Sequence, residues 1–155
     1  MGDMEKIKET LTVSTFEVFE KMFYVFLEPV NESDGEYELT ASIDFSGPAM
    51  GVIRVHFSRG MAEAMAQNML NIDRRELTEK LVEDCLKESV NMICGNFLRK
   101  LDAAKVFDLS LPVLAAYPET AGRPILLPSE DALELSFKSG DGTMGVVIAI
   151  NGSLQ

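Results

Sequence analysis

Residues 76–105 read ELTEKLVEDCLKESVNMICGNFLRKLDAAK and carry a long helical pattern. Apolar side chains recur every three or four residues, which places them on one stripe of a helix. That stripe consists of Leu86, Val90, Ile93 and Phe97. We therefore predict a long amphipathic helix whose apolar stripe packs against a core.

The other side of this helix carries a row of acidic and amide side chains. Asp84, Glu88 and Asn91 are four and three residues apart, so at about 100° per residue they share one stripe. Gly95 continues the stripe, and Met92 is predicted beside it on the exposed side. A solvated helix surface is the plain alternative. A methionine and a helix glycine, which costs about 1 kcal/mol relative to alanine, instead favour a contact surface.

The remaining elements follow from apolar periodicity and from turn residues. The sequence predicts helices over 3–28 and 60–70, and strands over 36–45, 50–57, 109–116, 132–138 and 143–151. Glu28-Pro29 is expected to end the first helix, and 31–35 and 117–128 are expected to be turn and loop. Pro112 cannot donate to a ladder, so 109–116 is predicted to be an edge strand or to hold a bulge.

Two hairpins share a pattern. Residues 45–53 read FSGPAMGVI and residues 137–147 read FKSGDGTMGVV, each with Phe, a glycine-bearing turn and Met-Gly-Val. A predicted helix lies upstream of each hairpin. The pattern indicates an internal duplication of a helix-plus-hairpin unit, with chance similarity of two ordinary hairpins as the alternative.

Composition limits the function classes. The 155 residues fit a single domain, 1–155, and 46% of them are apolar, enough for a core. A formal net charge of −11 argues against nucleic acid and anionic membranes as partners. No leader peptide or membrane segment is visible, so a cytoplasmic location is expected. Cys85 and Cys94 would lie roughly 13 Å apart along one helix, too far for a disulfide, and are expected to be reduced and buried.

The stretch DCLKESVNMICGN, residues 84–96, resembles the signature of the CheC–CheX–FliY phosphatases. That signature places an Asp or Ser, a Glu and an Asn at the spacing of Asp84, Glu88 and Asn91, followed by a proline. Pro112 is the matching proline, after twenty intervening residues, slightly fewer than the signature has. The resemblance covers nearly the whole chain. It implies a CheC-like α+β fold, in which an antiparallel sheet of two pseudo-symmetric hairpin units packs against two long helices.

The resemblance implies a protein phosphatase that hydrolyses phospho-aspartate on a CheY-like response regulator, in chemotaxis or another two-component pathway. Asn91 would hold the attacking water, and Glu88 would pair with the regulator's active-site lysine. Asp84, Met92 and Gly95 are expected to contact the partner. No cofactor of its own is expected, because Mg²⁺ would be bound by the regulator. The alternatives are a non-catalytic regulator-binding or flagellar-switch module, and an assembly protein; family analogy favours a homodimer.

Two other places in the sequence contain residues that could carry chemistry. The first helix carries Glu17 where the signature has Glu, but Glu20 stands where Asn is needed, and a carboxylate cannot donate a hydrogen bond. We therefore expect a single site, with Glu17 and Glu20 as surface or interface acids. His56, the one histidine, falls in a predicted strand and is interpreted as a packing or surface residue. No metal site and no glycine-rich phosphate loop is predicted.

Overall fold

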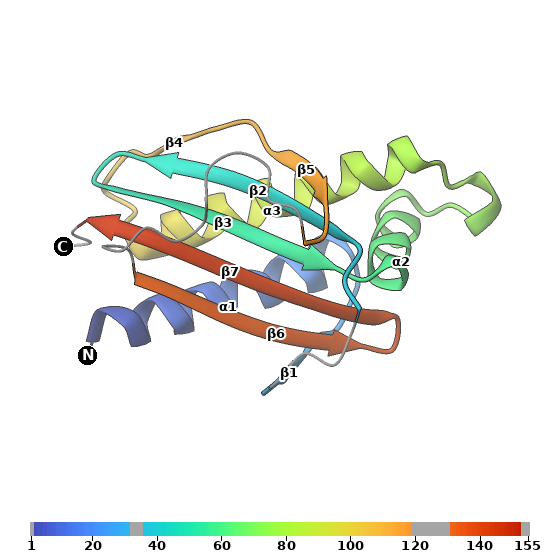
Figure 1. The fold of residues 1–155 in the computed structure, drawn as a ribbon, viewed down its shortest axis with the longest axis horizontal. Helices are drawn as coiled ribbons and strands as arrows, with labels where there is room; N and C mark the ends of the chain where they lie inside the picture. Colours follow the sequence, from blue (N-terminus) through green and yellow to red (C-terminus); the bar gives the residue numbers. More distant parts are fainter. Residues whose placement is uncertain (1, 32–35, 119–130, 153–155) are drawn as a thin grey trace.

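A computed structural model describes residues 2–31, 36–118 and 131–152 (Figure 1). The described residues form the helices α1 (Gly2–Met22), α2 (Arg59–Leu70) and α3 (Glu79–Leu101), and a 3₁₀ turn, η1 (Arg74–Glu76). The strands are β1 (Glu28–Val30), β2 (Leu39–Ser46), β3 (Ala49–Phe57), β4 (Asp108–Leu109), β5 (Val113–Ala116), β6 (Asp131–Ser139) and β7 (Gly142–Gly152). The strands make one antiparallel sheet, and α1 and α3 lie together across one of its faces (Figure 1).

The sheet is built from two similar halves. Its order is β1-β6-β7-β3-β2-β4, with β5 also paired to β2. The hairpins β2–β3 and β6–β7 therefore meet through β3 and β7, with Ile53 opposite Ile148 near the middle. Each half also lends a strand to the other, because β1 follows α1 and pairs with β6, while β4 and β5 follow α3 and pair with β2. The predicted fold of two pseudo-symmetric hairpin units against two long helices is confirmed.

The apolar stripe of α3 is buried, as predicted. Leu86, Val90, Ile93 and Phe97 are each 0% exposed. They belong to the same core cluster as Ala41, Ile43 and Phe45, the alternate residues of β2 that face the helices. The row of polar residues predicted on the opposite side of α3 is thus directed away from the core.

The bounds of α3 are narrower than predicted. The Thr78 side chain accepts a hydrogen bond from Leu81 N at 3.2 Å, so it caps a helix that begins at Glu79 rather than Glu76. Residues 74–76 form η1 instead, closed by the reciprocal contacts of Asp73 and Glu76. The C-cap, Asp102, is extended, which ends the helix at Leu101.

The prediction that the first helix extends to Glu28 is wrong. Helix α1 ends at Met22, where Tyr24 takes a left-handed conformation (φ 53°) and Val25 N donates to Phe19 O at 3.0 Å. This hydrogen bond closes the helix end around the left-handed Tyr24. Residues 23–27 then alternate buried and exposed, as in an extended chain. Glu28 and Pro29 are part of an edge strand rather than a helix stop.

The segment predicted as an edge strand is interrupted at its proline. Strands β4 and β5 both pair with β2 at the edge of the sheet, and residues 110–112 between them leave the ladder. The prediction of an edge strand with an irregularity is confirmed. The expected turn and loop at 31–35 and 117–128 lie almost entirely outside the described residues.

Both cysteines are free and buried, as expected. Burial raises the pKa of each thiol to about 12, with Glu88 adding a smaller contribution at Cys85. These thiols are protonated and unreactive at neutral pH. Among the described residues, no helix combines the length and the apolar character needed to cross a membrane.

His56 is a packing residue on the sheet face away from the helices. Its Nδ1 lies 2.8 Å from Thr40 Oγ1, and its ring lies 5.5 Å from that of Tyr37 and 4.9 Å from that of Tyr117. Burial, with help from the charge of Arg54, lowers the pKa of His56 to about 4. The interpretation of His56 as a packing or surface residue is confirmed.

The lowered pKa predicts a pH-dependent stability. Between pH 6.5 and about 4 the unfolded chain binds a proton at His56 that the native state does not bind, so the free energy of unfolding falls as the pH falls. Above pH 6.5 this group contributes no pH dependence. We expect His56→Gln to lose less stability than the parent protein between pH 7.5 and 4.5 in urea titrations. Equal losses in the two proteins would contradict this expectation.

Candidate functional site

Glu88 and Asn91 lie one turn apart on the exposed face of α3. The Asn91 side chain donates from Nδ2 to Glu88 Oε1 at 3.4 Å. This long contact turns the amide nitrogen toward the carboxylate, which leaves Asn91 Oδ1 open to solvent as a hydrogen-bond acceptor. Glu88 Oε2 has no partner among the described residues. The pair therefore offers one free amide oxygen and one free carboxylate oxygen to an incoming molecule.

The pair lines an open hollow of about 430 Å³, which we name the site hollow. One wall comes from α3 and the other from the interrupted edge of the sheet. The lining residues are Asp84, Lys87, Glu88, Asn91, Leu109, Ser110, Leu111 and Pro112. The structure thus brings together Asp84, Glu88, Asn91 and Pro112, the four positions of the sequence signature. The hollow is wide enough to admit a group carried by another molecule.

The second wall is fixed by β2. Ser110 N donates to Asp44 O at 2.9 Å, and Asp44 N donates to Ser110 Oγ at 2.9 Å. Leu109 pairs with Phe45 in the register of β2 and β4. Residues 109–112 therefore keep a defined position beside α3, although they form no continuous strand.

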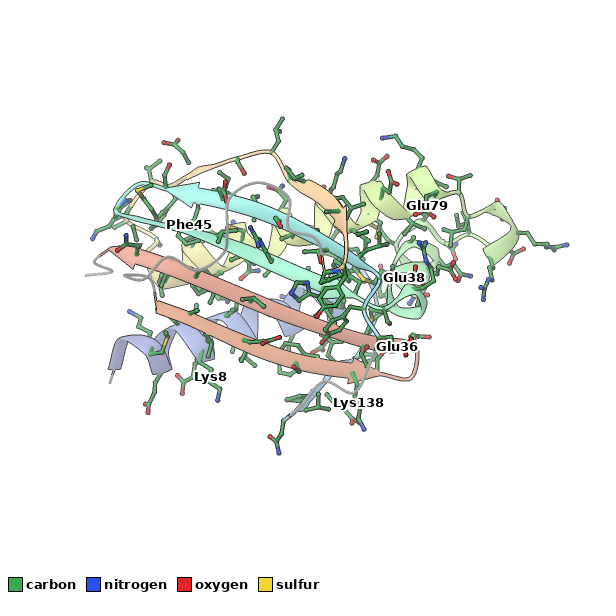
Figure 2. All side chains as sticks on the ribbon, in the orientation of Figure 1. Lys8, Glu36, Glu38, Phe45, Glu79 and Lys138 are labelled. Atoms are coloured by element: carbon green, nitrogen blue, oxygen red, sulfur yellow. The ribbon has the colours of Figure 1, made fainter. Side chains whose placement is uncertain are left out.

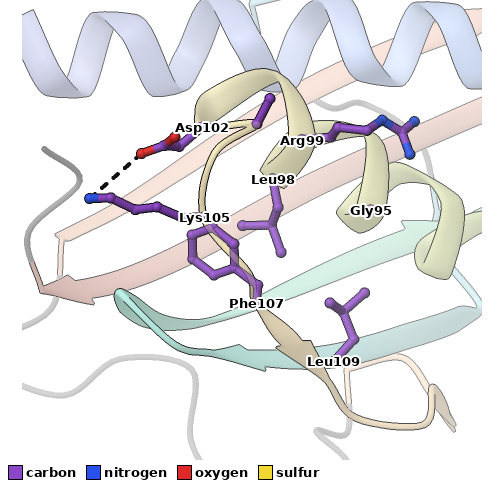
Figure 3. A pocket seen from close by; sticks show the side chains of 8 residues that line it. Gly95, Leu98, Arg99, Asp102, Lys105, Phe107 and Leu109 are labelled. Atoms are coloured by element: carbon purple, nitrogen blue, oxygen red, sulfur yellow. Dashed lines mark ion pairs between the residues drawn. The ribbon is translucent and has the colours of Figure 1, made fainter.

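A second hollow, of about 160 Å³, continues along α3 (Figure 3). It is lined by Gly95, Leu98, Arg99, Asp102, Ala103, Lys105, Phe107 and Leu109. Leu109 lines both hollows, which adjoin each other along α3, and we name the two together the α3 groove. At 1.5 Å per residue the stretch of α3 from Asp84 to its end spans roughly 27 Å, the size of a protein contact rather than of a small ligand.

The residues predicted to contact a partner fall in different surroundings. Asp84 lines the site hollow and forms an ion pair with Lys80 at 2.8 Å. Gly95 lines the second hollow. The expectation that Met92 lies on the exposed side is wrong, because Met92 is half-buried and packs against the core. It belongs to the row of α3 that also carries Asn96 and Lys100, which contact Glu17 of α1.

Gly95 is not required by packing within the chain. A Cβ placed on Gly95 would meet no atom within 4 Å. Since alanine is favoured over glycine inside a helix by up to about 1 kcal/mol, we expect Gly95→Ala to raise Tm by about 2–4 °C. Thermal unfolding followed by circular dichroism measures this, and a lower Tm would show an internal role that the structure does not contain.

The residues of α1 that correspond to Glu88 and Asn91 do not form a second site of this kind. Glu17 forms an ion pair with Lys100 of α3 at 3.0 Å, and this hydrogen bond lowers the pKa of Glu17. Glu20 is exposed and has no amide character. The interpretation of these residues as interface and surface acids is confirmed.

The N-terminal end of α3 is tied to the rest of the fold by Arg59. This side chain contacts Glu38 at 2.7 Å and Glu79 at 3.0 Å, and thus joins the approach to β2, the start of α2 and the start of α3. Figure 2 shows Glu38 and Glu79 near one another at the α2 end of the sheet. Surface ion pairs contribute little stability individually, so the position of α3 depends mainly on its buried stripe.

Sequence reasoning missed Lys87, Leu109, Ser110 and Leu111 in the site hollow. Lys87 is three residues from Asp84 and four from Asn91, so the helical spacing that selected those residues also selects Lys87. The other three adjoin Pro112, but only the pairing of β4 with β2 places them beside α3. In the described part of the chain, no three His, Cys, Asp or Glu side chains come together as a metal-binding group.

Comparison with known proteins places this arrangement in a family. A model of the family described as chemotaxis phosphatase CheX matches residues 39–122, which include β2, β3, α3 and Pro112. No curated protein matches the sequence.

Solved structures share the fold over nearly their full length. Chemotaxis protein CheX from Vibrio vulnificus is 23% identical, with a TM-score of 0.76 over 94% of this chain and 96% of that chain. CheX in the CheX–CheY–BeF₃–Mg²⁺ complex from Borrelia burgdorferi is 21% identical, with a TM-score of 0.69 over 93% and 97%. FliY from Thermotoga maritima is 14% identical, with a TM-score of 0.65 over 92% and 86%. Because the family model spans more than half of the sequence, this chain belongs to the CheX chemotaxis phosphatase family.

Proposed function

We propose that this protein hydrolyses the phospho-aspartate of a CheY-like response regulator, with Asn91 and Glu88 as its working residues. The observation that supports this most is the exposed pair, joined by the hydrogen bond from Asn91 to Glu88, that lines the open site hollow. A pair that projects from a helix can enter the phosphorylation site of another protein. The similar CheX structure from Borrelia burgdorferi was solved with CheY, BeF₃ and Mg²⁺.

Asn91 would position the attacking water. A phospho-aspartate is an activated acyl phosphate, so the main requirement is a water held in line with the leaving carboxylate. Asn91 Oδ1 accepts a hydrogen bond from that water, and its neutral amide does not repel the phosphoryl oxygens. The water oxygen attacks phosphorus, the bond from phosphorus to the aspartate oxygen breaks, and the water proton leaves with phosphate or to solvent. The products are inorganic phosphate and the free aspartate.

Glu88 would dock the regulator. Its free Oε2 can accept a charge-assisted hydrogen bond from the lysine ammonium in the regulator's phosphorylation site. Its Oε1 at the same time keeps the Asn91 amide oriented. The regulator would bring its own Mg²⁺, which neutralises charge on the phosphoryl group. A cytoplasmic regulator implies a cytoplasmic location for this protein.

Phosphate release tests the proposal. A receiver domain is phosphorylated with Mg²⁺ and a small phosphodonor, the donor is removed, and inorganic phosphate is followed with and without this protein. We expect catalytic amounts to accelerate release well above the receiver's own rate. Binding to the phosphorylated receiver without acceleration would identify a non-catalytic binding module instead. Light scattering on the same sample would test the expected homodimer.

A further inference from the structure

We infer that the regulator's receiver domain docks against an apolar rim of the α3 groove, formed by Phe107, Leu109 and Leu111. This inference rests on the proposed function and adds the surface that gives the partner its affinity. The rim faces the polar residues of α3 across the groove, so the partner would contact one polar wall and one apolar wall.

The rim side chains line the two hollows beside α3. Phe107 and Leu109 line the second hollow, and Leu109 and Leu111 line the site hollow. Leu109 lies opposite Phe45, a core residue on the helix-facing side of β2, which places Leu109 on the face toward α3. Phe107 packs edge-to-face on Phe45 with ring centroids 6.2 Å apart. Figure 3 shows Phe107 and Leu109 beside α3.

The rim is exposed but held in place. Leu111 is 85% exposed and Leu109 is 38% exposed. The reciprocal hydrogen bonds of Ser110 and Asp44, together with Pro112, restrain the backbone on both sides of Leu111. A segment whose backbone is already restrained loses little backbone entropy on binding, which favours its use as a docking contact.

The position of the rim identifies its occupant. Leu109 and Leu111 line the same hollow as Glu88 and Asn91, so a domain that brings a phosphoryl group to Asn91 must also cover them. Three cations, Lys87, Arg99 and Lys105, line the groove together with three acids, Asp84, Glu88 and Asp102, and Lys105 is paired with Asp102 at 3.6 Å. The charges lining the groove are therefore balanced, and the net charge of −11 disfavours long-range attraction to the acidic phosphorylation site of a receiver. Apolar contact at the rim then supplies affinity that charge does not.

Binding to a receiver domain treated with beryllium fluoride and Mg²⁺ tests the rim directly. We expect Leu111→Ser to weaken Kd about tenfold and to raise KM for phosphate release similarly, with kcat within about twofold. Tm should not change, because Leu111 is exposed. Val113→Ser is the matched control: Val113 is 48% exposed, but it pairs with Ser42 on the sheet face away from α3. Its Kd should equal that of the parent protein.

Gly95→Ala provides a second variant that cannot act by unfolding. It should raise Tm and also raise Kd for the receiver, because the added methyl group enters the groove that Gly95 lines. A Kd unchanged by Leu111→Ser, while Asn91→Ala lowers kcat about 100-fold, would overturn the docking role of the rim and leave the proposed phosphatase activity intact. If Leu111→Ser alters self-association while Kd for the receiver is unchanged, the rim is a contact with a second copy of this protein and the inference is overturned. Binding that depends on Leu111 without any acceleration of hydrolysis would support the docking role of the rim and refute the proposed phosphatase activity.

Discussion

Replacing Asn91 with alanine should lower kcat for phosphate release by about 100-fold and leave KM nearly unchanged. The amide positions a water rather than the partner, and misplacing a reacting group by about 1 Å has an effect of this size. Alanine is also a better helix former than asparagine, and Asn91 is exposed. The variant should therefore fold at least as stably as the parent protein. Steady-state phosphate release and thermal unfolding, measured on one preparation, separate the two effects.

Asn68→Ala is the control for this experiment. Asn68 is an exposed asparagine on α2, away from the α3 groove, so its loss should leave kcat unchanged. Full turnover by Asn91→Ala would refute the assigned role of the amide. A large fall in Tm would instead mean that Asn91 supports the helix, which its exposure and its one long hydrogen bond do not indicate.

The division of α3 into two sides explains why activity and stability should respond to different substitutions. Leu86, Val90, Ile93 and Phe97 carry the packing energy, and truncating such residues costs several kcal/mol. Glu88 and Asn91 make one weak contact between themselves and do not belong to the core cluster. The helix thus presents an exposed pair from a rigid element, as a functional site requires.

The parts of the fold that the sequence predicted correctly are those set by strong local periodicity. The buried stripe of α3 and the alternation of β2 each repeat over several turns or residues, so small errors at the ends do not alter the assignment. The end of α1 was mispredicted because five consecutive apolar residues, 23–27, fit a helix and a strand equally well. The left-handed conformation of Tyr24 decided between them, and such a conformation is rare outside glycine and asparagine.

The candidate site also has one part that could be predicted from the sequence and one part that could not. Asp84, Glu88 and Asn91 could be selected from the sequence, because all three lie on one helix at fixed spacing. The rim could not, because Leu109 reaches α3 only through its pairing with Phe45 of β2, a contact between distant parts of the chain. Met92 was misplaced because one residue turns a helix by about 100°, enough to move it from the groove to the side that faces α1.

Two substitutions at Glu88 should separate its two roles. Glu88→Gln keeps an oxygen that can accept the Asn91 hydrogen bond but removes the charge offered to the regulator's lysine. Loss of a charge-assisted hydrogen bond corresponds to roughly a 10- to 100-fold rise in KM, and kcat should change little. Glu88→Ala removes both oxygens, so we expect the same rise in KM and also a fall in kcat, because the Asn91 amide is no longer oriented.

The test depends on the difference between Glu88→Gln and Glu88→Ala, and neither variant is sufficient alone. Glu20→Gln on α1 controls for the loss of one negative charge from a protein with a net charge of −11, and should alter neither parameter. Equal kcat in Glu88→Gln and Glu88→Ala would show that Oε1 does not orient Asn91. An unchanged KM in both variants would show that the Glu88 carboxylate does not contribute to docking. The apolar rim and the cations of the groove would then account for binding.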